Sequence, residues 1–364
     1  MHSSVAKMSV NDAPRSTGIS AVRMLTMLAL AFGYVSTMAR GPGTAEYGRV
    51  FGYDPSWHGT NVLFIFAGYF VLKTLNRHGS VVKMLKARAR RNLVPVTIFA
   101  FIVVSIIFPL LGKPAATFGE TFYRLADYAF GLITCTDPGA LLPGLLDDAK
   151  YMCSMQGAIW TLRWGAFAYL VTAIAWPTGV LKKKTWTFTL AATGIIAYIL
   201  ALQNYVFSWV SMPDEILVPL RLGAMFCMGL GAYSFVELKG IQSRKTIILG
   251  ALICLAIAIF NDLILPWTPI IEVLSAFGFA LSAVALSKII DKSRFGNIAL
   301  RDVSIWIFLI HWPAAQLLLV ALPNLTSWTL IALTLPLTLI LSVIMSKATE
   351  AALFLQRPRR TAQA

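Results

Sequence analysis

The sequence predicts an all-α polytopic membrane protein with about ten transmembrane helices. Of its 364 residues, 57% are hydrophobic and only 13% are charged, and the mean hydropathy is +0.72. A soluble domain of this length needs roughly twice that charged fraction to cover its surface. The apolar residues form blocks of roughly 16 to 25, long enough to cross the hydrocarbon layer as helices. The alternating pattern of a membrane β-barrel is absent.

Ten apolar blocks define the predicted spans. Arg23 interrupts the first block and nine more follow it, so this block is predicted to be a retained helix rather than a cleaved signal peptide. The spans are predicted at 18–38, 59–75, 94–111, 157–176, 186–203, 216–236, 246–261, 265–287, 304–322 and 327–346. They form one membrane domain, 18–346, between an N-terminal tail (1–17) and a basic C-terminal tail (347–364).

The distribution of basic residues predicts that both termini are cytoplasmic. Of 31 Lys and Arg residues, the predicted external loops hold only Arg40, Arg49, Lys113, Arg124 and Lys150. Such a bias sets the orientation of membrane proteins. The net charge of +15 therefore reflects topology and attraction to anionic lipid headgroups. We expect a multi-pass protein of the inner (cytoplasmic) membrane, with the lipid bilayer and no nucleic acid as partner.

The longest predicted external loop, 112–156, is acidic. Its segment "TFYRLADYAFGLITC" is compatible with a re-entrant or interfacial helix. Cys135 and Cys153 share this loop, and in an oxidising periplasm they would be free to form a disulfide. A disulfide and two free thiols both remain open. Cys227 and Cys254 fall in predicted spans, where we expect them only to pack.

The strongest cytoplasmic feature is the basic segment 73–95, "KTLNRHGSVVKMLKARARRNLVP". The helical spacing of its cations predicts an amphipathic helix at the lipid headgroups, ended by Pro95 where the third span begins. The cations have two interpretations: contact with anionic lipid, which charge alone favours, or a site for a phosphorylated donor. They are Lys83, Lys86, Arg88, Arg90 and Arg91.

Three predicted spans carry an arginine. Arg23, Arg163 and Arg221 each lie near enough to a membrane face for the side chain to snorkel. The carboxylates near helix interiors are Glu272 and Glu350, so we expect that pairing within the protein does not satisfy all three arginines. Because intramembrane charges are costly and usually functional, an anionic ligand is the competing interpretation.

His311 lies in the middle of a predicted span, within "DVSIWIFLIHWPAAQLLLV". Pro313 frees the carbonyl of Leu309 four residues earlier. His311 is then either a structural residue, hydrogen-bonded to that region or to Ser304, or a functional imidazole in a hydrated cavity. This stretch alone favours the structural role.

Taken together, these segments resemble the bacterial membrane acyltransferase-3 family, which acylates sugars of the cell envelope. "GTNVLFIFAGYF" resembles the family signature GVDLFFVLSGFL, and "RARRNLVP" resembles the basic segment RRxxRxxP. "IWTLRWGAFAYL" is similar to WSLxxExxxYL, and "LRDVSIWIFLIHWP" is similar to DISYxIYLxHxP. The resemblance covers nearly the whole chain and includes the ten spans and the cytoplasmic N-terminus.

The resemblance implies a fold and an activity. The donor is expected to be a cytoplasmic acyl-CoA, with acetyl as the expected group, and the acceptor a hydroxyl of an envelope glycan or glycolipid. No tightly bound cofactor and no metal is expected. The residues implied are Arg88, Arg90, Arg91 and Arg23 for acyl-CoA, His311, Tyr34 and Arg23 for catalysis, and Arg163, Arg221 and Ser304 for substrate binding.

The sequence departs from the family at two positions. A histidine that follows the first arginine after ten residues in the family is Tyr34 here, and the glutamate of the WSLxxE segment is Gly165. Tyrosine, with an ordinary pKa near 10, is a poor general base. The alternative is therefore a catalytically impaired member of the fold that binds or translocates a glycan or lipid, or assists a partner. A secondary transporter is the least favoured class, since no internal repeat is evident.

Overall fold

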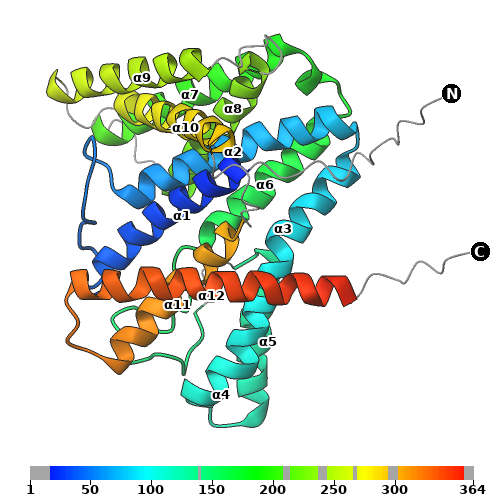
Figure 1. Cartoon of the computed structure of the whole chain (residues 1–364). Helices are drawn as coiled ribbons and strands as arrows, with labels where there is room; N and C mark the ends of the chain where they lie inside the picture. The colour runs from blue at the N-terminus through cyan, green and yellow to red at the C-terminus, as the bar shows by residue number, and fades with distance from the viewer. Residues whose placement is uncertain are drawn as a thin grey trace, which may run out of the picture.

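A computed structural model describes residues 17–137, 141–207, 214–236, 244–264, 269–293 and 302–355. These residues form helices and no strands, and the helices pack side by side (Figure 1). The long apolar blocks become helices because a helix pairs all of its own backbone groups, as the hydrocarbon layer demands.

The helices differ in length, and two segments of π- and 3₁₀-helix interrupt them. They are α1 (Thr17–Met38), α2 (Pro55–His78), α3 (Val81–Ile102), the π-helix η1 (Val103–Ile107), α4 (Phe108–Leu111), α5 (Phe118–Thr134), α6 (Trp160–Ala175), the 3₁₀-helix η2 (Val180–Lys182), α7 (Lys184–Phe207), α8 (Asp214–Val236), α9 (Arg244–Ile264), α10 (Pro269–Lys292), α11 (Ser304–Ala321) and α12 (Ser327–Leu355).

Within the described ranges, seven helices are long and apolar enough to cross a membrane. They are α1, the continuous helix from α3 to α4, α7, α8, α10, α11 and α12. The apolar part of α9, Ile247–Leu263, is shorter, and α2 and α6 overlap the two other predicted spans. A polytopic all-α membrane protein is therefore confirmed, whereas the count of ten spans stays a prediction.

The first and last helices run in opposite directions. The ring of Phe32, late in α1, lies 6.3 Å from the ring of Trp328 at the start of α12. The start of α1 and the end of α12 therefore lie on the same side of the bundle (Figure 1). That this side is cytoplasmic stays a prediction from the Lys and Arg distribution.

Two apolar clusters form most of the core. One includes Phe64 of α2 and Phe226 of α8, and the other includes Leu30 of α1 and Phe308 of α11. The backbones of α2 and α8 are in direct contact, since a Cβ added at Gly68 would lie 2.1 Å from the Phe226 carbonyl oxygen. Only glycine permits such an approach, and it makes α2 and α8 a closely joined pair.

The basic segment is not a separate interfacial helix. α3 runs without a break from Val81 to Ile102, and Pro95 lies inside it. The prediction that Pro95 ends the basic helix is therefore wrong. Proline is tolerated within membrane helices where neighbouring groups satisfy the freed backbone. The basic turns and the apolar third span are thus one rigid element.

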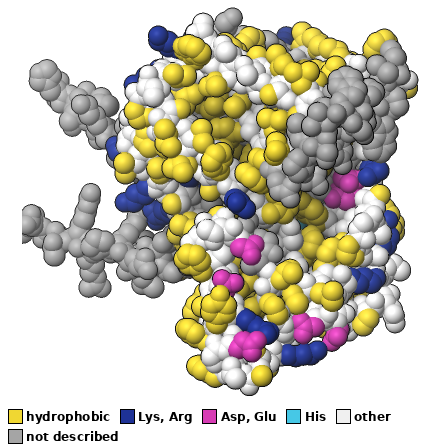
Figure 2. All heavy atoms as spheres, turned by 180° about the vertical axis from the view of Figure 1, so that it is seen from behind, with side chains coloured by type: hydrophobic (Ala, Val, Ile, Leu, Met, Phe, Trp, Pro, Cys, Tyr) yellow, Lys and Arg dark blue, Asp and Glu magenta, His cyan; other side chains and the backbone are white. Residues whose placement is uncertain are grey.

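The predicted external loop contains a helix, as expected. α5 covers most of the "TFYRLADYAFGLITC" segment, and its Phe118 and Tyr123 are exposed. Figure 2 shows Lys, Arg, Asp and Glu side chains together at the lower end of the molecule, where α5 lies, below a largely uncharged surface. Cys135 and Cys153 are free thiols with separate partners, the Leu132 carbonyl and the Asp147 carboxylate.

Candidate functional site

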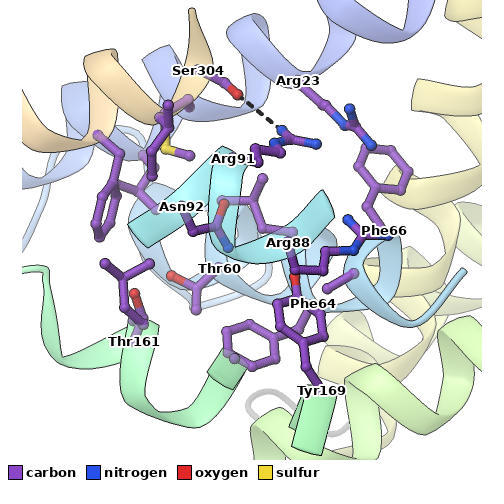
Figure 3. A pocket seen from close by; sticks show the side chains of 18 residues that line it. Arg23, Thr60, Phe64, Phe66, Arg88, Arg91, Asn92, Thr161, Tyr169 and Ser304 are labelled. Carbon is purple, nitrogen blue, oxygen red and sulfur yellow. Dashed lines mark hydrogen bonds between the residues drawn. The ribbon is translucent and has the colours of Figure 1, made fainter. Parts of the chain in front are cut away.

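A cavity of about 140 Å³ lies where the two apolar clusters meet. Five helices line it: α1, α2, α3, α6 and α11. One end of it is basic and the other apolar (Figure 3). The helices run alternately up and down, so residues far apart in sequence converge at each end.

The basic end brings three arginines together, and two of them share one carboxylate. Arg23 Nη1 lies 3.2 Å from Asp302 Oδ2, and Arg91 Nη2 lies 3.1 Å from the same oxygen. The Ser304 hydroxyl donates to Asp302 Oδ1 at 2.6 Å and accepts from Arg91 at 3.3 Å. Arg88 lines the cavity beside them. With one carboxylate for three guanidinium groups, this end keeps an excess of positive charge and is suited to an anion.

Aromatic rings hold two of these arginines in place. The guanidinium carbon of Arg23 lies 4.2 Å from the centre of the Phe70 ring, and that of Arg88 lies 5.3 Å from the Tyr169 ring. Such cation–π contacts orient a guanidinium group without using its hydrogen-bond donors. Arg88 Nε is buried and has no hydrogen-bond partner in the structure, so this donor is free for a ligand.

Asp302 is ionised at neutral pH despite its burial. Burial raises its pKa, but Arg91, Arg23 and the hydrogen bonds from Ser304 oppose this and hold the pKa below its usual range. Asp302 also accepts a hydrogen bond from the backbone N–H of Ser304, at the start of α11. Asp302 therefore ties α1, α3 and the first turn of α11 together.

The inner end of the cavity is apolar apart from two threonines. Leu30 of α1 and Phe308 of α11 line it together with Thr60 and Thr161. Each threonine hydroxyl donates to a carbonyl of its own chain neighbourhood, Ser56 at 2.8 Å and Ala158 at 3.1 Å. Their hydroxyl oxygens therefore face the cavity as acceptors. This end is suited to an uncharged group rather than to a phosphate.

Tyr34 and His311 lie together, one helical turn beyond the cavity. Tyr34 follows Leu30 by four residues on α1, and His311 follows Phe308 by three on α11. Residues at these spacings share a helix face, so each lies on the side of its helix that faces the cavity. Their rings are stacked with centroids 6.0 Å apart. His311 Nδ1 lies 3.1 Å from the Ile307 carbonyl oxygen, and Nε2 is buried without a partner. A carbonyl only accepts, so Nδ1 carries the hydrogen and Nε2 keeps its lone pair.

The carbonyl freed by Pro313 has a partner other than His311. Gln156 Nε2 donates to the Leu309 carbonyl at 3.2 Å and also to that of Phe308. His311 bonds to the backbone of the same turn, at the Ile307 carbonyl, and not to the Leu309 carbonyl itself or to Ser304. Gln156 satisfies the break in α11, and His311 is left with an uncommitted nitrogen.

Gln156→Leu is expected to lower the free energy of unfolding by about 2 kcal/mol, because it leaves the buried Leu309 carbonyl, which Pro313 cannot pair, without a donor. Thermal unfolding of the purified protein in detergent measures the effect. Asn261→Leu serves as the control, since the exposed Asn261 side chain only donates to a carbonyl of its own helix. Equal stability of the two variants would contradict this role for Gln156.

A second buried polar cluster lies outside the cavity lining. Glu272 of α10 is fully buried and accepts from Trp57 Nε1 at 2.6 Å, from Asn61 Nδ2 at 2.7 Å and from the Tyr198 hydroxyl. Arg221 lies over the Trp57 ring at 3.4 Å, with Nε and Nη1 unpartnered. Arg221 is thus buried inside the protein rather than extended toward a membrane face. It lies away from the basic end of the cavity.

The structure groups only some of the predicted site residues. Arg23, Arg88, Arg91 and Ser304 line the cavity. Arg90 and Arg163 are exposed and outside the lining, with Arg163 5.4 Å above the Trp164 ring. Asp302, Asn92, Thr60, Thr161 and Tyr169 were not predicted as site residues.

Asp302 is the main site residue that the sequence analysis did not identify. Sequence reasoning counted Glu272 and Glu350 as the carboxylates available to the arginines and passed over Asp302, two residues before Ser304. Its pairing with Arg23 spans 279 positions, so only the packing of α1 against α11 reveals it.

Among the described residues, no group of His, Cys, Asp and Glu is arranged to hold a metal ion.

Comparisons with known proteins agree with this arrangement. The sequence model of the acyltransferase-3 family, described as an acyltransferase domain, matches residues 17–347. A comparison with curated proteins and one with solved structures each found no match. The family match covers every helix that lines the cavity. The chain therefore belongs to the acyltransferase-3 family.

Proposed function

We propose that this membrane acyltransferase moves an acyl group from acyl-CoA to a hydroxyl of a cell-envelope glycan or glycolipid. The observation that carries the proposal is the convergence of Arg23, Arg88 and Arg91 on one cavity whose other end is apolar. A thioester donor has the same two parts, an anionic nucleotide and an uncharged acyl end.

The donor's phosphates bind at the basic end. Arginine contacts phosphate oxygens through two parallel N–H donors. Arg88 and Arg91 lie three residues apart, and residues at this spacing share one face of a helix. A volume of about 140 Å³ holds the thioester end and not the nucleotide. The nucleotide therefore stays at the mouth of the cavity, beside the basic end.

The transfer needs a base and a group that stabilises negative charge. The acceptor oxygen bonds to the thioester carbonyl carbon, and its proton passes to His311 Nε2, beside Tyr34. The carbon–sulfur bond then breaks, and the CoA thiolate takes up the proton from His311 as it leaves, while Arg23 binds the anionic part of the donor at the basic end. Leu30 and Phe308 separate the pair from the cavity, so their side chains move aside during the reaction.

The family and the predicted topology support the proposed acceptor and location. We place the protein in the inner membrane, with the donor on the cytoplasmic side and the acceptor reaching the Tyr34–His311 pair from within the membrane or the external side. Analysis of O-acyl esters on envelope glycans, with and without the gene, tests this assignment. Unchanged esters would contradict it.

Arg88→Gln and Arg91→Gln are each expected to weaken acyl-CoA binding by about 10- to 150-fold, because each removes hydrogen bonds to a charged group worth about 1.5–3 kcal/mol. Equilibrium binding of radiolabelled acetyl-CoA to protein in nanodiscs measures this. Arg90→Gln is the matched control, as Arg90 lies on the same helix but is exposed. Equal losses in all three variants would point to general surface charge instead of a site.

The second candidate is a non-catalytic member of the fold. It is favoured by the separation of Tyr34 and His311 from the cavity and by the absence of the family's histidine and glutamate at positions 34 and 165. Such a protein binds acyl-CoA or a glycan without turnover. Persistent absence of both acyl transfer and slow hydrolysis of labelled acyl-CoA, with binding intact, would favour this candidate.

A further inference from the structure

We infer that the cavity accepts an acyl chain longer than acetyl, and that Gly165 is the residue that leaves room for it. This inference rests on the proposed function. It concerns the acyl group, for which the family resemblance implied acetyl.

Gly165 occupies the middle of the cavity wall. It lies on α6, four residues after Thr161 at the inner end and four before Tyr169 beside Arg88, and all three line the cavity. Residues at this spacing share one helix face. A side chain at position 165 would therefore project between the basic end and the apolar end.

No packing contact requires glycine at this position. A Cβ added at Gly165 would meet no atom within 4 Å, whereas one at Gly68 or Gly229 would collide with a backbone carbonyl of the facing helix. The φ angle of Gly165 lies outside the left-handed region. Glycine inside a helix costs about 1 kcal/mol relative to alanine, so what it provides here is open space in the cavity.

The walls around this space are apolar. Met27, Leu63, Phe64, Leu162 and Phe308 line the cavity, and the two threonine hydroxyls are already donating within the protein. A buried surface of this kind gains from contact with methylene groups and gives little to a polar group.

The size of the cavity sets the chain length. An apolar cavity of about 150 Å³ is known to hold benzene, a molecule of six carbons, and this one measures about 140 Å³. Because the thioester and the basic end take up part of this volume, about six carbons is the upper limit for the acyl chain. An acetyl group would leave much of the wall without contacts, and the lost dispersion would weaken its binding.

The test compares donors of increasing chain length. Protein in nanodiscs is titrated with CoA, acetyl-CoA, butanoyl-CoA, hexanoyl-CoA and decanoyl-CoA in competition with a labelled CoA thioester. We expect wild-type affinity to rise about fourfold per added methylene up to about hexanoyl and then to stop rising. Gly165→Leu is expected to weaken the binding of hexanoyl-CoA at least tenfold more than it weakens the binding of acetyl-CoA.

Two further variants control for folding and surface effects. Ala166→Leu places the same leucine side chain one residue along, at an exposed position, and is expected to keep the wild-type profile. Gly165→Ala adds a single methyl group and is expected to shorten the preferred chain by about one carbon without harming the helix. Thermal unfolding confirms that each variant is folded.

The outcomes separate this inference from the function on which it rests. If CoA and acetyl-CoA bind but affinity does not depend on chain length, or if Gly165→Leu and Gly165→Ala leave the profile unchanged, the inference is overturned and the proposed function stands. If no CoA thioester binds the wild-type protein, both are overturned.

Discussion

Replacing His311 with asparagine is expected to lower acyl transfer by about 10²- to 10⁴-fold, the usual contribution of a general base. Asparagine retains an N–H donor near the Ile307 carbonyl and removes the Nε2 lone pair, which is the buried nitrogen without a partner. The measurement is the amount of O-acyl ester on envelope glycans from cells that express the variant, normalised to protein in the membrane.

The control is a second buried histidine. His58 Nε2 lies 2.9 Å from the Val50 carbonyl oxygen, and its ring packs on Phe279. His58→Asn is expected to cost similar stability and to leave acyl transfer within a few-fold of the wild type. Full activity of a well-expressed His311→Asn variant would remove His311 from the mechanism.

Replacing Asp302 with asparagine is expected to lower the free energy of unfolding by up to about 3 kcal/mol, the lower end of the range for breaking a buried ion pair. The side chain of Asp302 is 11% exposed, and two arginines lose their shared carboxylate. Their mutual repulsion then disturbs the basic end, so acyl-CoA affinity is expected to fall as well. Thermal unfolding and binding of labelled acetyl-CoA measure the two effects.

The pH dependence has a definite sign. Because the pKa of Asp302 is lowered in the folded protein, its stabilisation is fully present above the ordinary aspartate pKa near 4 and is lost as the pH falls through the lowered value. Wild-type stability should therefore drop in this acidic range, and Asp302→Asn should flatten the drop. Asp148→Asn is the control, since Asp148 is 93% exposed in its pair with Lys113 and is expected to change little. If the stability of Asp302→Asn falls with decreasing pH in parallel with that of the wild type, the assignment is contradicted.

The membrane helices were predictable because the bilayer imposes a simple length and hydropathy rule. Each predicted span overlaps a helix. The error at Pro95 arose because the rule for proline is a local one: it frees a carbonyl and crowds the preceding turn. In α3 the packing against neighbouring helices outweighs that local cost, and a sequence pattern does not contain that packing.

The residue types of the site could be predicted from the sequence, but not which side of each helix faces the cavity. The family resemblance of the segment "RARR" implied a site for acyl-CoA, yet it gave Arg90 the same weight as Arg88 and Arg91. Residues three apart share a helix face and their neighbours do not, but which face meets the cavity depends on how α1 and α11 pack against α3. The same dependence on distant helices concealed Asp302. It also concealed the separation of Tyr34 and His311 from Arg23, three helical turns away on α1.

Because α3 is unbroken, a single rigid helix carries two groups of cations that attract different anions. On one side, Arg88 and Arg91 turn inward to the cavity, while Lys83, Lys86 and Arg90 stay exposed on the other. Negative charge in the surrounding leaflet and negative charge on an incoming thioester therefore pull on opposite flanks of a single element. Because both groups of cations lie within residues 83–91 of one continuous helix, a tilt that favours one necessarily repositions the other.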